Sequence, residues 1–253
     1  MKDNNFLIDN YIATNHWATC RNNFNSVLNV FNYYGFAFKD YSESQTDADL
    51  YVHLFNENGE KICSKQEFLK TGHSLHIEIN SIMKNFQGIV STQLVPKGKM
   101  KRLSNKIRLP IATSYFMMYK RNEVFCDFSH ELFPIKLEYN NKVLEWMTIL
   151  YFSKNLNPGF VIMNSLFNPK IKKSDEVIIE LKDINNKNTI LSKKINLNGM
   201  GSKLIKLSEL IDTENLIKNN ETKSLTAIVR GKNIEQPMSV HLHNSGDFNI
   251  HHF

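Results

Sequence analysis

Apolar and polar residues alternate along most of the chain, in short runs that end at turn-forming residues. The clearest run places Leu50, Val52 and Leu54 on one face of a strand, and the segment from Asn56 to Gly59 then supplies a turn. Only residues 211–219 suggest a helical turn. Because no long amphipathic segment separates the runs, the pattern predicts an all-β, antiparallel fold rather than a parallel α/β sheet. Comparable runs predict further strands at residues 6–12, 26–31, 73–79, 88–95, 111–119, 143–152, 160–167, 177–181, 203–207, 225–229 and 238–243.

The second half of the chain repeats the order of the first. Both halves end on an Asp-Phe pair, at Asp127 and at Asp247. Collinear matches of this kind indicate an internal duplication. The sequence therefore predicts two tandem antiparallel β-sandwich domains of jelly-roll type, residues 1–137 and 138–253. The matched segments are 27–32 with 162–168, 50–58 with 177–185, 77–82 with 205–210, 88–90 with 227–229, and 110–116 with 237–243.

The order of elements in the second half runs from the Asn-containing strand near 162–168 to a Pro-initiated strand, 237–243, that ends in histidine. This order resembles the small β-sandwich of the sensory rhodopsin transducer family. The resemblance spans most of residues 160–247 and, more loosely, 26–128. It implies a jelly-roll-like sandwich and carries no site with it.

Charge and cysteine content narrow the functional classes. The 31 Lys and Arg residues exceed the 25 Asp and Glu residues, but only five of them are Arg. Arg supplies the bidentate contacts of specific nucleic-acid readers, so a Lys-dominated excess predicts only weak, salt-sensitive attraction to anions. The three cysteines have no CxxC spacing, and no segment reaches the ~18 apolar residues of a membrane span. We therefore expect reduced thiols, no membrane span and a cytoplasmic location.

A histidine cluster near residue 253 is the richest candidate for chemistry. In a strand, His241 and His243 share one face at a spacing that two ligands of a single metal can span. His251 or His252 supplies a third ligand if the intervening turn folds the chain back, and Asp247 can orient an imidazole from behind. The pattern predicts a divalent metal site. The competing interpretation is a solvated strand face.

The first half differs at the matching positions. The alignment places Ser114 and Phe116 opposite the two strand histidines, so the fold itself does not require histidine there. Asp127 and His130 follow the matching strand, and at a turn they can form a general acid–base pair. The alternative is structural, with Asp127 capping the turn through backbone amides.

A basic segment, residues 96–108, has no counterpart in the second half. It predicts an anion-binding ribbon for a polyanion, although such segments also occur as solvated loops. A second unusual segment, residues 31–41, is rich in Phe and Tyr and suits either sugar binding or a core between domains. The cationic residues of the basic segment are Lys97, Lys99, Lys101, Arg102, Lys106 and Arg108.

Two functional hypotheses follow. No Gly-rich phosphate loop, serine-hydrolase elbow or HExxH motif is present, so the first hypothesis is a binding or adaptor protein without a cofactor. Its two sandwiches would present a composite surface to a small ligand, a carbohydrate or a protein partner, including a second copy of the chain. The second hypothesis is a metal-dependent, cupin-like enzyme that uses the histidine cluster.

Overall fold

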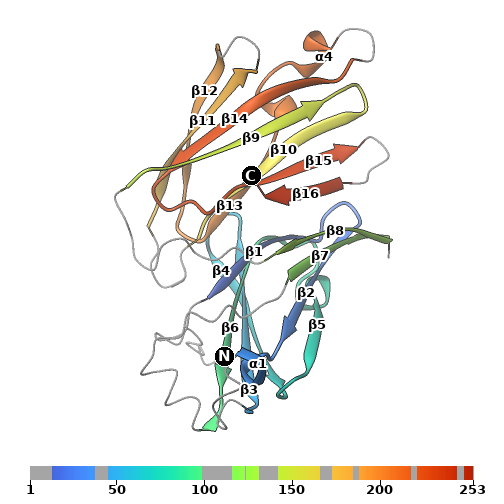
Figure 1. Ribbon diagram of the computed structural model, residues 1–253, viewed down its shortest axis with the longest axis vertical. Helices are drawn as coiled ribbons and strands as arrows, with labels where there is room; N and C mark the ends of the chain where they lie inside the picture. The colour runs from blue at the N-terminus through green and yellow to red at the C-terminus, as the bar shows by residue number, and fades with distance from the viewer. Residues whose placement is uncertain are drawn as a thin grey trace.

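Four antiparallel sheets of four strands each make up the described part of the chain, two in each half. The two halves lie one above the other in Figure 1. This confirms the prediction of an all-β antiparallel fold. The computed structural model describes residues 13–37, 45–98, 116–122, 124–130, 142–165, 173–184, 188–217, 221–243 and 248–252.

The first half contains the sheets β1-β6-β3-β4 and β5-β2-β7-β8. We call their two-layer arrangement the first sandwich. Its strands are β1 (Thr14–Thr19), β2 (Phe24–Phe31), β3 (Ala48–Asn56), β4 (Lys61–Leu69), β5 (Ser74–Glu78), β6 (Gln87–Pro96), β7 (Phe116–Arg121) and β8 (Val124–His130).

The second half contains the sheets β9-β14-β11-β12 and β13-β10-β15-β16, which form the second sandwich. Each sheet has the strand order of its counterpart in the first half, with every strand number raised by eight. The two sandwiches therefore share one topology, while a common origin by duplication stays a prediction. The boundary predicted at residue 137 lies outside the described residues. The strands are β9 (Leu144–Phe152), β10 (Leu156–Asn164), β11 (Asp175–Asp183), β12 (Thr189–Leu197), β13 (Gly201–Lys206), β14 (Lys223–Gly231), β15 (Met238–His243) and β16 (Phe248–His252).

Helical structure is confined to short turns in the described part of the chain. The helical turn predicted at 211–219 is present as α4, and the Asp212 carboxylate caps it by accepting a hydrogen bond from the Asn215 backbone at 3.2 Å. No helix among the described residues is long and apolar enough to cross a membrane. The helical segments are α1 (Tyr34–Ala37), α2 (Ile79–Ile82), η2 (Leu207–Glu209) and α4 (Thr213–Leu216).

A buried asparagine occupies the same place in each sandwich. The side-chain amide of Asn32 donates to the carbonyl of Leu69, the last residue of β4, at 3.1 Å. The amide of Asn164 donates to the carbonyl of Leu197, the last residue of β12, at 2.9 Å. Each amide also donates to a carbonyl just ahead of the following strand, β3 or β11. The two asparagines are therefore equivalent, and they set the register between the sandwiches.

This register corrects the sequence alignment at two strands, β2 and β7. Residues 27–32 correspond to 159–164 rather than to 162–168. Four residues before each asparagine, β2 pairs with Met117 of β7 and β10 pairs with Ser239 of β15. Two residues further along β7 and β15, Tyr119 and His241 are therefore equivalent. The sequence alignment had matched His241 with Ser114 instead. The strands were matched correctly but displaced by five positions, because a short run of apolar residues does not by itself fix the register of a strand.

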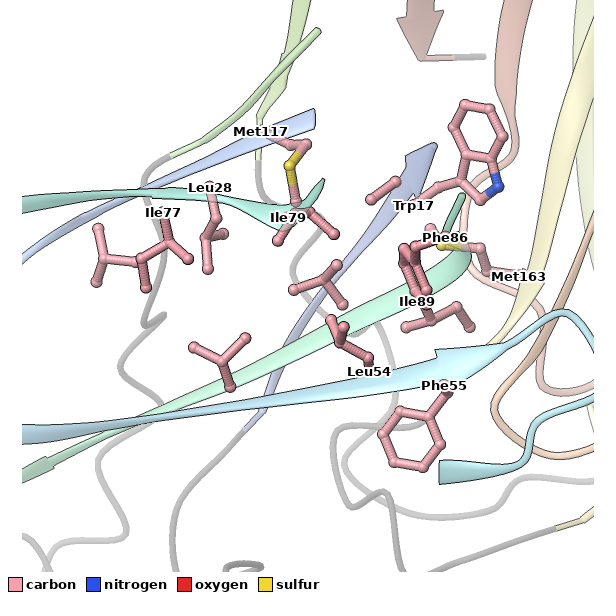
Figure 2. Close-up of a cluster of buried hydrophobic side chains, with 14 of the residues drawn as sticks. Trp17, Leu28, Leu54, Phe55, Ile77, Ile79, Phe86, Ile89, Met117 and Met163 are labelled. Carbon is pink, nitrogen blue, oxygen red and sulfur yellow. The ribbon is translucent and has the colours of Figure 1, made fainter. Parts of the chain in front are cut away.

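The core of the first sandwich fills the space between its two sheets. Leu28, Leu54, Ile77 and Met117 are almost completely buried in it (Figure 2). Tyr34 joins this core, and its hydroxyl donates to the Leu94 carbonyl at 2.7 Å. The two roles considered for the aromatic segment, sugar binding and a core between domains, stay predictions, because Tyr34 packs within the first sandwich.

The same apolar cluster continues into the second sandwich. Trp17 and Ile89 lie on the outer face of the β1-β6-β3-β4 sheet, as their pairing shows. They belong to one buried cluster with Val161 and Met163 of β10 and Met238 of β15, and Figure 2 draws Met163 beside this group. The outer face of one sheet of the first sandwich is thus covered by the outer face of the β13-β10-β15-β16 sheet.

Polar contacts complete the interface between the sandwiches. The Asn15 amide of β1 donates to the buried carboxyl of Glu235 at 3.3 Å. Beside it, the backbone amide of Ser202 donates to the Glu57 carbonyl at 3.1 Å. Gly59 has φ of +82°, and a Cβ there would stand 2.3 Å from a backbone oxygen of the second sandwich. Only glycine allows this close approach of the two turns.

Candidate binding cleft between the sandwiches

A cleft lies at the edge of the contact between the two sandwiches, with a cavity volume of about 90 Å³. Its lining comes from β1, β2, β6 and the β1–β2 turn on one side and from β13 and β15 on the other. Neither sandwich forms the cleft alone. The lining residues are Trp17, Thr19, Arg21, Asn22, Phe24, Gln87, Leu204, Lys206, Val240 and Leu242.

The β1–β2 turn positions two of the lining side chains. Asn22 and Asn23 have φ of 54° and 64°, in the left-handed region that Asn tolerates better than most residues. The turn closes through the Phe24 amide, which donates to the Arg21 carbonyl at 3.0 Å. It therefore places a guanidinium and an aromatic ring at the same end of the cleft.

A chain of polar contacts forms the first wall. The Arg21 guanidinium pairs with the Glu57 carboxylate at 2.9 Å, and the Gln87 amide donates to the same carboxylate at 2.7 Å. The Thr19 hydroxyl in turn donates to the Gln87 amide oxygen at 3.2 Å. Each member fixes the next, so this wall is held in one arrangement before a ligand arrives.

The second wall is apolar and carries one cation. Leu204, Val240 and Leu242 lie against the cluster that joins the sandwiches. Lys206, at the end of β13, is half-buried and makes no ion pair with any described residue. Arg21 is already neutralised by Glu57, so Lys206 is the cation available to a ligand. The walls together suit a small molecule with an apolar body and one anionic group.

The structure describes only part of the predicted histidine site. β15 and β16 pair antiparallel, so the chain does fold back as the metal hypothesis requires. His241 is half-buried and His243 is exposed, and their strand alternation puts both on one face. In backbone register His251 lies opposite Ser239 and His252 opposite Met238. Asp247 lies outside the described residues, and among those described no group of three metal-ligating side chains comes together.

The predicted Asp127 and His130 pair is not at a turn. Both residues lie within strand β8, where Asp127 is opposite Tyr119 and His130 is opposite Phe116. The chain reverses earlier, at Asn122, whose φ of 46° suits the tight connection from β7 to β8. The expectation of a turn-capping aspartate at position 127 was therefore wrong.

Only the start of the basic segment is described. Lys97 pairs with the Asp49 carboxylate at 2.9 Å and lies 4.6 Å from the centre of the Phe68 ring. These contacts hold Lys97 on the surface of the first sandwich. The other predicted anion-binding residues, Lys99, Lys101, Arg102, Lys106 and Arg108, lie outside the described residues.

The lining of the cleft contains none of the residues singled out from sequence. Its two walls come from strands far apart in the chain, and no spacing rule connects Trp17 with Lys206. One signal was available: Trp17 is an isolated large aromatic in a run of small and polar residues. Such a residue on a strand marks a face that packs against something outside its own sheet.

Comparisons with known proteins add little to this geometry. No family model matches the chain, and no curated protein matches it. A solved structure of a glycosyl hydrolase family 2 member from Bacteroides cellulosilyticus is similar with 8% identity and a TM-score of 0.18. The match covers 95% of this chain and 26% of that one, so this chain spans about a quarter of that protein's length. At that TM-score the likeness carries no argument.

Proposed function

We propose that the protein is a non-enzymatic binding protein whose cleft between the two sandwiches receives a small ligand with an anionic group. The observation that carries the proposal is the composite lining, which combines Trp17 and Phe24 of the first sandwich with apolar residues and Lys206 of the second. Aromatic and apolar walls with one or two placed polar groups are the usual composition of ligand sites.

The volume limits the ligand. Sites for drug-sized molecules typically enclose ~300–1,000 Å³, whereas this cavity encloses about 90 Å³. A carboxylate on a small ring or short aliphatic group fits that volume. A larger carbohydrate or a protein partner would insert only one group and leave the rest outside the cleft.

Tryptophan fluorescence tests the proposal directly. The chain has two tryptophans, so a Trp146→Phe variant leaves Trp17 as the only reporter. We expect benzoate to change the Trp17 emission saturably, and glucose, which has no charge, to leave it unchanged. Inorganic phosphate, an anion without an apolar body, should bind more weakly than benzoate.

A charge variant separates the cleft from general anion binding. Lys206→Gln in the Trp146→Phe background should weaken benzoate binding by about tenfold, since one charge-assisted hydrogen bond contributes about 1.5–3 kcal/mol. The matched control is Lys203→Gln, because Lys203 lies on the same strand, on the opposite face, and is exposed. Equal loss in both variants, or no saturable response in the parent, would overturn the proposal.

A metal-dependent, cupin-like enzyme is the second candidate function. The observation that favours it is the β15–β16 pairing, which brings the backbone of His251 and His252 beside the strand that carries His241 and His243. Elemental analysis of untagged protein tests it. Stoichiometric metal that disappears in the His241→Ala, His243→Ala double variant supports the enzyme. Absence of metal, with no stabilisation by added Zn²⁺ or Fe²⁺, argues against it.

Three further elements belong to this proposal. A cytoplasmic location, weak polyanion contact through residues 96–108, and a signalling role of the kind suggested by the sensory rhodopsin transducer resemblance are each consistent with a small-ligand binding protein. Salt-sensitive retention on heparin, lost when Lys99 and Lys101 are changed to Ser, tests the polyanion contact. Retention that does not depend on salt would argue against it.

A further inference from the structure

The outer face of the β9-β14-β11-β12 sheet exposes an apolar stripe on its edge strand. Met147, Ile149 and Tyr151 are 63%, 44% and 49% exposed, and they alternate along β9 with residues that face the core. Ile228 of β14 pairs with Met147 but is only 6% exposed, so the exposed stripe lies on β9. A contiguous apolar patch on an edge strand is a feature that soluble proteins usually cover.

In the first sandwich, the equivalent sheet face is covered by another part of the chain. The equivalent asparagines, Asn32 and Asn164, are 132 positions apart, and this offset puts Ile149 at the position of Trp17. Trp17 is only 2% exposed, because the β13-β10-β15-β16 sheet of the second sandwich lies over it. One chain thus contains this sheet face twice, once covered and once open.

The covering sheet also occurs twice. In the first sandwich its counterpart is β5-β2-β7-β8. In the second sandwich, Met238 and Val240 cover the sheet face that carries Trp17. By register they correspond to Phe116 and Met118 of the first sandwich. Both of these residues are apolar and half-buried. On β7 the first sandwich therefore keeps the apolar character of a covering face, whereas on β2 the buried Asn29 stands where β10 has Val161.

Charge does not oppose contact at the open face. Arg230 of β14 pairs with Glu145 of β9 and, at 2.9 Å, with Glu180 of β11. Lys182 lies 3.7 Å from the same Glu180 carboxylate. Because these charges neutralise one another, a second copy of this basic chain meets no local excess of positive charge there.

We propose that the open β9 face binds a second copy of this chain through the β7 side of that copy's β5-β2-β7-β8 sheet. The contact repeats between molecules the packing that already joins the two sandwiches within one molecule. Such a contact is head-to-tail, so it generates rings or chains of molecules rather than a symmetric pair.

Sedimentation analysis over a range of protein concentrations tests this. We expect the parent to form species larger than a dimer. Ile149→Lys and Met118→Lys should each weaken association by at least tenfold. The matched control is Ile190→Lys on β12, because Ile190 is 45% exposed and lies at the far edge of the same sheet. It should associate like the parent.

Mixing the two variants gives the decisive result. Each keeps one intact face, so a mixture of Ile149→Lys with Met118→Lys should form a one-to-one complex and nothing larger. If Met118→Lys alone still forms dimers, the β9 faces pair with each other and the head-to-tail contact is wrong. A parent that stays monomeric at every concentration also overturns the proposal. Met118→Gln, with circular dichroism as the check on folding, replaces Met118→Lys if the lysine variant does not fold.

Discussion

The two sandwiches present the same sheet face to different surroundings, and the residues differ accordingly. In the first sandwich the face carries Trp17 and the neutral His53, both buried. Burial lowers the pKa of His53 to about 4, with a further contribution from Lys61. In the second sandwich the matching face carries the ion pair of Glu180 with Arg230, whose side chains are partly exposed to water. One topology thus accepts a buried interface or a charged surface, depending on what covers it.

The largest effect should come from the position that Trp17 and Ile149 share. Trp17→Ala removes a large ring from the contact between the sandwiches and should cost about 3–5 kcal/mol of unfolding free energy. Ile149→Ala removes a side chain that is already 44% exposed and should cost less than about 1 kcal/mol. Urea unfolding of both variants at low protein concentration measures the difference. Equal costs would show that the two faces are not in different environments.

Ionisation of Glu235 should weaken the contact between the two sandwiches, because this buried carboxyl belongs to the polar part of their interface. Burial raises the pKa of Glu235 to about 8, although hydrogen bonds from Ser165 and Asn15 favour the charged form. The folded protein therefore holds a proton that the unfolded chain releases near pH 4.5. The stabilisation from this group is complete below pH 4.5 and is lost as the pH rises to about 8.

The matched variant for this titration is Glu235→Gln, which keeps the shape and removes the ionisation. Between pH 5 and pH 8 the parent should lose on the order of 3 kcal/mol more unfolding free energy than Glu235→Gln. Other groups titrate equally in both proteins, so the difference isolates Glu235. Parallel pH profiles for the two proteins would contradict the assignment of a protonated carboxyl at this position.

Much of the fold was predictable from alternation, but five edge strands, β1, β4, β8, β12 and β16, were not among the predicted runs. The strand predicted at 238–243 is β15, residue for residue. β4 and β12 were missed because most of their side chains are exposed and include several lysines. Both are edge strands of their sheets. Edge strands facing water carry charge instead of a regular apolar period.

The cleft was not predictable from any local pattern. Alternation in 238–243 predicts that Val240 and Leu242 face a core, and they do face apolar side chains. Those side chains belong to another sandwich, however, and a single strand cannot reveal which surface it meets. The spacing of the histidines matches that of metal ligands, which can be read from the sequence. Trp17 and Lys206 line one cleft only when the two sandwiches pack together.

The equivalent asparagines test whether the shared topology has shared energetics. Asn32→Ala and Asn164→Ala each remove an amide that donates to two backbone carbonyls. Each should cost about 2 kcal/mol, since a carbonyl left without its donor pays a desolvation penalty. Chemical denaturation of both variants gives the comparison. A cost confined to one sandwich would show that the motif supports only that half.

The smallest effect should come from the charged network of the open face. Arg230→Gln removes a guanidinium that joins Glu145 of β9 to Glu180 of β11. Exposed ion pairs contribute little, because water screens the charges and ordering long side chains costs entropy. The variant should therefore lose under about 1 kcal/mol in urea, and less still at high salt. A loss as large as that of Trp17→Ala would mean that a second copy buries the open face in solution, and the loss should then fall as the protein is diluted.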